Sequence, residues 1–316
     1  SGRNSGVLHA GFYYAPDSLK ARLTRRGNEL LREFCAERGV LVRETGKVVV
    51  ATSDEQLPAL QELYRRGMAN GVPLELIDEQ QTHELEPLAF TAGQALWSPT
   101  TAVASPVAVV EALAERVRER GGEVLLGCEV TGAGGGWVMT ARQGRIAAGH
   151  VVNAAGLHAD TVAHWFGVGE DYRMLPFKGL YWYGNWPEGR LQRHVYPVPD
   201  ARNPFLGVHL TVTVDGKAKV GPTAIPALIR SELPKYLRRH LVGQAQALVP
   251  SIRPEDFTVK GRPGVRAQLL HVPSGKLEMD FIVRPGDRST HVLNAVSPAW
   301  TSSLAVADHV VSGIMA

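Results

Sequence analysis

The sequence contains very little cysteine. Cys35 and Cys128 are the two cysteines in 316 residues, and no CxxC spacing occurs. This scarcity argues against a disulfide framework, a zinc site and a dithiol redox centre. We therefore expect no bound metal and a reducing compartment, the cytoplasm.

Long apolar runs and a strong charge of one sign are also missing. No apolar run approaches the roughly 20 residues that a membrane-spanning helix requires. Lys and Arg total 34 against 31 Asp and Glu, a formal net charge of +3, and the basic residues are scattered. Scattered charge argues against a nucleic-acid-binding stripe and a polybasic membrane patch. We therefore expect no nucleic-acid partner. An anionic small molecule is compatible with this charge as a ligand, and peripheral contact with the inner membrane is left open.

The order of elements indicates an α/β protein with two packed parts. A chain of 316 residues exceeds the usual limit of about 250 to 300 residues for a single core. Apolar spacing and stop signals predict helices over residues 19–38, 54–70, 105–119, 230–248 and 297–314. Strands are predicted over 46–53, 95–97, 123–130, 137–141, 145–148, 150–156, 178–183, 194–196, 207–214, 218–221, 264–268, 281–283 and 291–294. Alternating strands and helices beside a mixed sheet are typical of a nucleotide-binding domain that carries a substrate domain.

The stretch from Asn4 to Tyr14, NSGVLHAGFYY, is the most informative in the chain. Its glycines would let the backbone approach a ligand closely, and Asn4 and Ser5 offer short donors to phosphate or ribose oxygens. His9 follows, between these donors and the aromatic residues. An ordinary glycine-containing loop explains these eleven residues equally well. The interpretation as a cofactor-binding loop therefore depends on other segments of the chain.

Two further segments place backbone N–H groups where anions bind. In VVNAAG, Gly156 stands where a strand meets a helix start, which is the usual ligand position in open α/β sheets. Ser297 and Pro298 open the last helix, whose positive end would face a negative charge. A tight β-to-α turn and ordinary capping residues are the alternative interpretations.

Taken together, these segments resemble the FAD-dependent amine and hydroxy-acid oxidoreductases of the D-amino-acid-oxidase type, and within them the L-2-hydroxyglutarate oxidase and dehydrogenase family. The likeness covers almost the whole chain. Its most specific motifs are NSGVLHAGFYY, GKVVVAT, YPVP, FLGVHLT and GVRAQ.

The resemblance implies a Rossmann-like FAD domain and a mixed antiparallel β domain that holds the substrate over the flavin. The FAD domain would comprise 1–46, 98–170 and 260–316, and the substrate domain 47–97 and 171–259. The implied activity is oxidation of L-2-hydroxyglutarate or a similar 2-hydroxy acid, with hydride passing to flavin N5 and electrons to oxygen or a quinone. Two alternatives stay open: an amine or amino-acid oxidase of the same fold, and a non-catalytic binding protein.

The resemblance also implies roles for individual residues. A histidine suits the base for the substrate hydroxyl, and His209 is preferred over His9 because its strand should line the substrate chamber. Arg266 would bind a substrate carboxylate through two parallel hydrogen bonds. Further substrate contacts would come from Lys178, Tyr181, Tyr13 and Tyr196. The FAD contacts would be Asn4, Ser5, Gly6, Val130, Gly156, Ser297, Pro298, Thr301 and Ser302.

The sequence departs from this family at its start. The family opens with a strand, a Gly-x-Gly-x-x-Gly turn, a helix and a strand, and these residues do not contain that unit. Because the unit normally supplies the central strand and the main pyrophosphate site, we expect this chain as printed to lack bound flavin. Either it is part of a longer active flavoenzyme or it is an inactive truncated product. The intact remaining motifs favour the first explanation.

Overall fold

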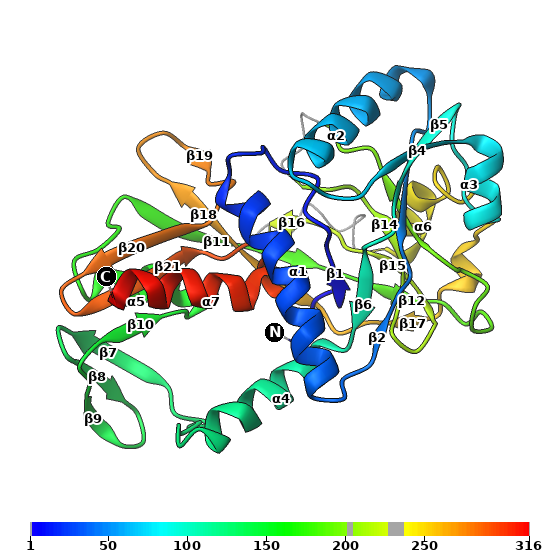
Figure 1. Cartoon of the computed structure of the whole chain (residues 1–316). Helices are drawn as coiled ribbons and strands as arrows, with labels where there is room; N and C mark the ends of the chain where they lie inside the picture. The colour runs from blue at the N-terminus through cyan, green and yellow to red at the C-terminus, as the bar shows by residue number, and fades with distance from the viewer. Residues whose placement is uncertain (1, 201–204, 227–236, 316) are drawn as a thin grey trace.

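The computed structural model describes residues 2–200, 205–226 and 237–315, which form a mixed α/β structure (Figure 1). Within this part of the chain, no helix combines the length and apolar character that crossing a membrane requires. The predicted helix over 230–248 lies partly outside the described residues, and its described part is α6 (Arg238–Ala245).

The largest sheet has eight strands and is almost entirely antiparallel. Its one parallel pair among the described strands joins β13 to β3. In spatial order its strands are β17 (Val259–Lys260), β12 (Trp182–Tyr183), β15 (Ala218–Gly221), β14 (His209–Val212), β13 (His194–Pro197), β3 (Lys47–Val50), β5 (Gln94–Ser98) and β4 (Glu75–Asp78).

The two faces of this sheet differ in chemistry because side chains alternate along each strand. Val48, Val195, Leu210 and Val220 are fully buried on one face, in a core that includes α6. The residues between them face the other way. We call this other side the polar face, and it carries Lys47, His194, Tyr196, His209, Thr211 and Lys219, all buried.

Four smaller sheets complete the β structure. β1 (Val7–Leu8), β6 (Ala102–Ala104) and β2 (Val42–Arg43) form one, and β10 (Val151–Asn153), β21 (Ser289–Asn294) and β20 (Ile282–Gly286) form another. The third contains β16 (Ile225–Pro226), β11 (Tyr172–Gly179), β18 (Gly264–His271) and β19 (Lys276–Leu277). The fourth contains β7 (Val130–Gly134), β8 (Trp137–Thr140) and β9 (Gly144–Ala147).

Three of the described helices begin at residues whose side chains cap them. Ser18 accepts a hydrogen bond from Ala21 N–H at the start of α1 (Leu19–Glu37), and Ser105 caps α4 (Pro106–Glu119) in the same way. Asp78 and Gln81 form a capping box at the start of α3 (Glu79–Leu85). The others are α2 (Leu57–Ala69), α5 (Ala159–His164) and α7 (Ala299–Met315); α1 packs against α7, as the blue and red helices of Figure 1 show.

Two predicted strands were wrong. The segment 123–129 is irregular, and β7 begins only at Val130, because Gly127 takes a left-handed φ of 63° and the exposed segment has no face to bury. The predicted strand over 178–183 is interrupted after Gly179. The chain leaves the four-stranded sheet there and enters the eight-stranded one at Trp182. Alternation alone does not reveal such a change of sheet.

The predicted division into two domains stays a prediction. Most strands of the eight-stranded sheet come from 47–97 and 171–259, the segments assigned to the substrate domain. However, β11 pairs along its length with β18, which belongs to the segments assigned to the FAD domain. The four-stranded sheet therefore links the two predicted parts.

His194 is a structural histidine on the polar face. Its Nδ1 accepts a hydrogen bond from Val212 N–H at 3.0 Å, so its Nε2 carries the proton and donates to Thr45 Oγ1 at 2.9 Å. Burial and the charge of Lys47 lower its pKa well below the ordinary 6.5. Protonating Nδ1 would break the bond to Val212.

We expect the free energy of unfolding to fall as the pH drops below about 6.5. The unfolded chain takes up the proton on this histidine near pH 6.5 and the folded chain does not, so the loss begins there and grows by up to about 1.4 kcal/mol per pH unit. His194→Gln should reduce this slope in urea unfolding measured from pH 7.5 to 5.0. The exposed His83 on α3 provides the control, since His83→Gln should keep the wild-type slope; an unaltered slope in His194→Gln would contradict the assignment.

Candidate active site

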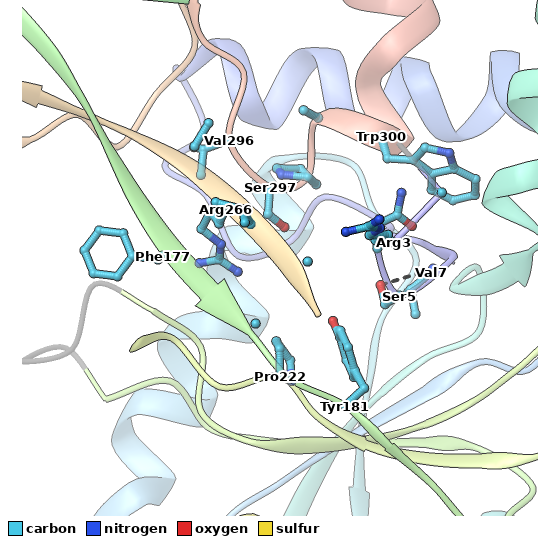
Figure 2. A pocket seen from close by; sticks show the side chains of 18 of the residues that line it. Arg3, Ser5, Val7, Phe177, Tyr181, Pro222, Arg266, Val296, Ser297 and Trp300 are labelled. Carbon is cyan, nitrogen blue, oxygen red and sulfur yellow. Dashed lines mark hydrogen bonds between the residues drawn. The ribbon is translucent and has the colours of Figure 1, made fainter. Parts of the chain in front are cut away.

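Segments from both ends and the middle of the chain converge on one cavity of about 960 Å³. Its walls come from residues 2–9, 156–157, 177–183, 222–224, 260–267 and 295–301. Figure 2 shows Arg266 and Ser297 on one side of it, Arg3 and Trp300 on another, and the hydroxyl of Tyr181 pointing inward. His9, Gly156 and Ser297, which lie far apart in sequence, border the same space.

The first residues form tight turns that place the backbone against β6. Asn4 Oδ1 accepts from Gly6 N–H at 2.8 Å, and Ser5 Oγ accepts from Val7 N–H at 3.3 Å (Figure 2). Gly6 has a φ of 78°, and a Cβ there would come within 2.5 Å of the carbonyl oxygen of Ala104. The glycine is thus required by close backbone packing, and Asn4 and Ser5 rather than Gly6 line the cavity.

The backbone around His9 is held by the last helix. Thr301 Oγ1 accepts from His9 N–H at 3.1 Å and donates to Val7 O at 3.1 Å. From α1, Asn28 Nδ2 donates to His9 O at 3.1 Å. Three hydrogen bonds from two helices therefore fix this residue on the cavity wall.

The imidazole of His9 is available for chemistry. Its Nδ1 is buried and has no hydrogen-bond partner among the described residues. Burial lowers its pKa well below the ordinary value, and the charges of Lys47 and Arg266 lower it further. The ring is therefore neutral at pH 7, so one of its nitrogens carries a lone pair.

The cavity wall is basic. Arg3, Lys260, Arg262 and Arg266 line it, and the described lining residues include no aspartate or glutamate. Arg266 extends from β18 with its guanidinium 5.0 Å from the ring centre of Phe205, and burial lowers its pKa. A half-buried cation that faces no described acid on this wall favours an anionic ligand.

Another part of the wall fits a phosphate-bearing cofactor. Gly156 has a φ of 59° and no atom within 4 Å of where a Cβ would lie, at the start of the short 3-10 helix η2 (Gly156–His158). The segment from Ser297 to Thr301 brings the N-terminus of α7 to the cavity, where free backbone N–H groups favour negative charge. Trp300 Nε1 is buried without a described partner. These groups would hold FAD.

The structure places the other predicted residues away from the lining. His209 stacks on Tyr196 with ring centres 3.8 Å apart, and its Nδ1 donates to Gly207 O at 2.8 Å. Its Nε2 is therefore the basic nitrogen, and burial lowers the pKa to about 3. Ser302 is fully buried and hydrogen-bonds Thr24 Oγ1 at 3.2 Å. Outside the lining too are Gly6, Tyr13, Val130, Lys178 and Tyr196, whose predicted roles stay predictions.

Sequence reasoning missed two buried lysines of the polar face. Lys219 Nζ donates to Ser5 O at 3.1 Å and so connects β15 to the first turn. Lys47 opens the run KVVV, is fully buried, and has no hydrogen-bond partner for its Nζ among the described residues. The signal was the lysine itself, because a charged side chain at the start of a buried run of valines needs a particular environment.

Comparisons with known proteins agree with this geometry. The sequence model of the family described as FAD dependent oxidoreductase matches residues 1–312. L-2-hydroxyglutarate dehydrogenase from Escherichia coli K12 is 33% identical over 353 residues, covering 99% of this chain and 83% of that protein. The human mitochondrial enzyme of that name is 34% identical over 364 residues, covering 97% and 78%.

Two solved structures show the fold. L-alpha-glycerophosphate oxidase from Mycoplasma pneumoniae with FAD bound superposes with a TM-score of 0.84 at 23% identity, covering 96% of this chain and 82% of that one. Glycine oxidase from Geobacillus kaustophilus superposes with a TM-score of 0.74 at 21% identity, covering 96% and 82%. The predicted fold class is confirmed. The chain is an enzyme that belongs to the FAD dependent oxidoreductase family, and its resemblance to L-2-hydroxyglutarate dehydrogenases is confirmed.

Proposed function

We propose that this enzyme oxidises L-2-hydroxyglutarate, or a similar short 2-hydroxy acid, to the 2-oxo acid. The observation that carries the proposal is that Arg266 and His9 line one cavity whose described lining has no acidic side chain. Relatives that are 33 to 34% identical over nearly the whole chain are named for L-2-hydroxyglutarate. When bound, the flavin accepts the two electrons that leave the substrate carbon.

The residues of this chain would bind and deprotonate the substrate. Arg266 binds the carboxylate next to the reacting carbon, because a guanidinium forms two parallel hydrogen bonds with a carboxylate. His9 takes the hydroxyl proton, since its ring is neutral and lies on the cavity wall. His209 is the second candidate for the base, with Nε2 free of described partners, but Tyr196 covers one face of its ring.

The charge of the wall distinguishes hydroxy acids from amino acids. An amino-acid substrate brings an ammonium group beside its carboxylate, and no described lining side chain offers it a carboxylate. A hydroxyl group carries no such charge. The basic wall therefore favours the hydroxy acid over the amine or amino-acid oxidase alternative.

We expect the protein supplied with FAD and a redox dye to turn over L-2-hydroxyglutarate in preference to glycine, sarcosine and proline. The preference in kcat/KM should exceed tenfold, because the ammonium of an amino acid lacks a counterion on this wall. Steady-state rates with each compound decide the matter. A larger kcat/KM for any of the amines would identify an amine oxidase and remove the proposal.

Arg266→Lys should raise KM for the hydroxy acid about 10- to 100-fold, because one point charge replaces two directed hydrogen bonds. Flavin absorbance per protein should stay at the wild-type level, since the change concerns the substrate. Arg118→Lys, on the exposed face of α4, serves as the control. Loss of flavin with an unchanged KM would instead place Arg266 at the cofactor.

His9→Gln should lower kcat by about 10² to 10⁴, the range that a general base contributes, while flavin content is retained. His209→Gln should have a smaller effect, because Tyr196 covers one face of that ring and Gly207 O holds its Nδ1. Single-turnover flavin reduction measures the step directly. The opposite ranking of the two variants would assign the base to His209.

A further inference from the structure

A group of buried polar side chains lies between the first segment and the polar face. Its centre is Lys47, whose Nζ is 5.1, 5.0 and 4.4 Å from the ring centres of Phe12, Tyr13 and Tyr196. Phe12 stacks on Tyr13, and Tyr196 stacks on His209, so two stacked ring pairs flank the ammonium group. We call His9, Tyr13, Lys47, Tyr196 and His209 the buried polar cluster.

The cluster has donors without acceptors. Lys47 Nζ and the hydroxyls of Tyr13 and Tyr196 are all buried, and none has a hydrogen-bond partner among the described residues. Buried polar groups in folded proteins are normally paired, because an unpaired donor loses its bond to water and gains nothing in return. Three unpaired donors around one centre therefore indicate a ligand that supplies acceptors.

The charge of the cluster indicates the same kind of ligand. No described carboxylate forms an ion pair or hydrogen bond with Lys47, and burial alone lowers its pKa to about 7. The aromatic rings offset part of the cost of burying the ammonium group. An incoming anion would offset the rest, since it pairs with the lysine and accepts from both hydroxyls.

The cluster adjoins the proposed substrate cavity. His9 belongs to the cluster and also lines the cavity that Arg266 enters. The charges of Lys47 and Arg266 both act on His9, as their shared effect on its pKa shows. Both basic side chains therefore act on the residue that would meet the substrate.

We propose that Lys47, together with the hydroxyls of Tyr13 and Tyr196, binds the second carboxylate of a dicarboxylic 2-hydroxy acid. This inference rests on the proposed function, because it concerns the same substrate. Arg266 binds the carboxylate beside the reacting carbon, His9 contacts the hydroxyl, and Lys47 selects for a chain that ends in another carboxylate. Selectivity for a dicarboxylate over a monocarboxylate then comes from Lys47, a residue of β3.

The test compares two five-carbon substrates, 2-hydroxyglutarate and 2-hydroxyvalerate, which differ in the second carboxylate. In the FAD-loaded enzyme, Lys47→Met should raise KM for 2-hydroxyglutarate about 10- to 100-fold, the range of one hydrogen bond to a charged group, and leave KM for 2-hydroxyvalerate within about twofold. Lys219→Met provides the matched control. That lysine is also buried on the polar face but donates to Ser5 O, so its removal should affect both substrates alike.

A binding measurement gives a second readout that needs no turnover. Glutarate should raise the melting temperature of the wild-type enzyme more than valerate does, and Lys47→Met should abolish this difference. If Lys47→Met does not fold, Tyr196→Phe, which removes one donor and keeps the ring, should reduce the same difference. Equal losses for both substrates, or an unchanged preference for glutarate, would overturn the inference. A wild-type enzyme that oxidises neither hydroxy acid contradicts the proposed function, while the glutarate comparison still tests the subsite.

Discussion

The hydroxyl of Thr301 joins the beginning of the chain to its end, and the cavity depends on this connection. It accepts from His9 N–H and donates to Val7 O, residues 292 and 294 positions away. A threonine hydroxyl can do both at once, which neither valine nor alanine can. The same contact brings the N-terminus of α7 beside the segment that carries His9. The group that would bind a cofactor anion and the group that would accept a proton are therefore positioned by one side chain.

Burying the side chains of the polar face costs free energy, which the rest of the fold has to offset. Buried lysines and histidines lose their hydration, and the pKa values of Lys47 and Lys219 fall to about 7 and 8 for that reason. The opposite face of the sheet is a continuous apolar core with valines and leucines from the same strands. Strand alternation thus supplies stability on one face and polar groups on the other. Unpaired buried donors call for an explanation, and a bound ligand that supplies acceptors is one.

Much of the fold could be predicted from the sequence because the signals were local. Ser105 followed by Pro106 marked the start of α4, and Asp78 with Gln81 marked α3. Signals that depend on tertiary contacts were not readable. The strand predicted over 178–183 spans two sheets, and nothing in its composition shows where the chain passes from one to the other. Whether His9 or His209 acts as the base likewise depends on which ring faces the cavity.

The site residues could be predicted to the same extent, since local motifs revealed some of them and tertiary contacts decided the others. Asn4, Ser5, Gly156, Arg266 and Ser297 were named from motifs, and all five line the cavity. Gly6 was named from the same glycine pattern, yet its position is explained by a backbone carbonyl of β6 rather than by a ligand. A glycine motif shows that the backbone is approached closely, but it does not show by what. Lys47 was quoted within its motif without a role, because valines occupy both faces of its strand and its aromatic neighbours come from other segments.

The fold itself cannot decide the substrate. Similar folds occur in proteins named for glycerophosphate and for glycine, one an anion without an amine and the other an amino acid. These compounds differ most in charge, so discrimination has to come from charged groups that reach the substrate. In this chain the candidates are basic side chains, the half-buried Arg266 on the cavity wall and the buried Lys47 near His9. Two basic side chains near a neutral histidine match a substrate with two carboxylates and a hydroxyl between them, and they oppose one that carries an ammonium group.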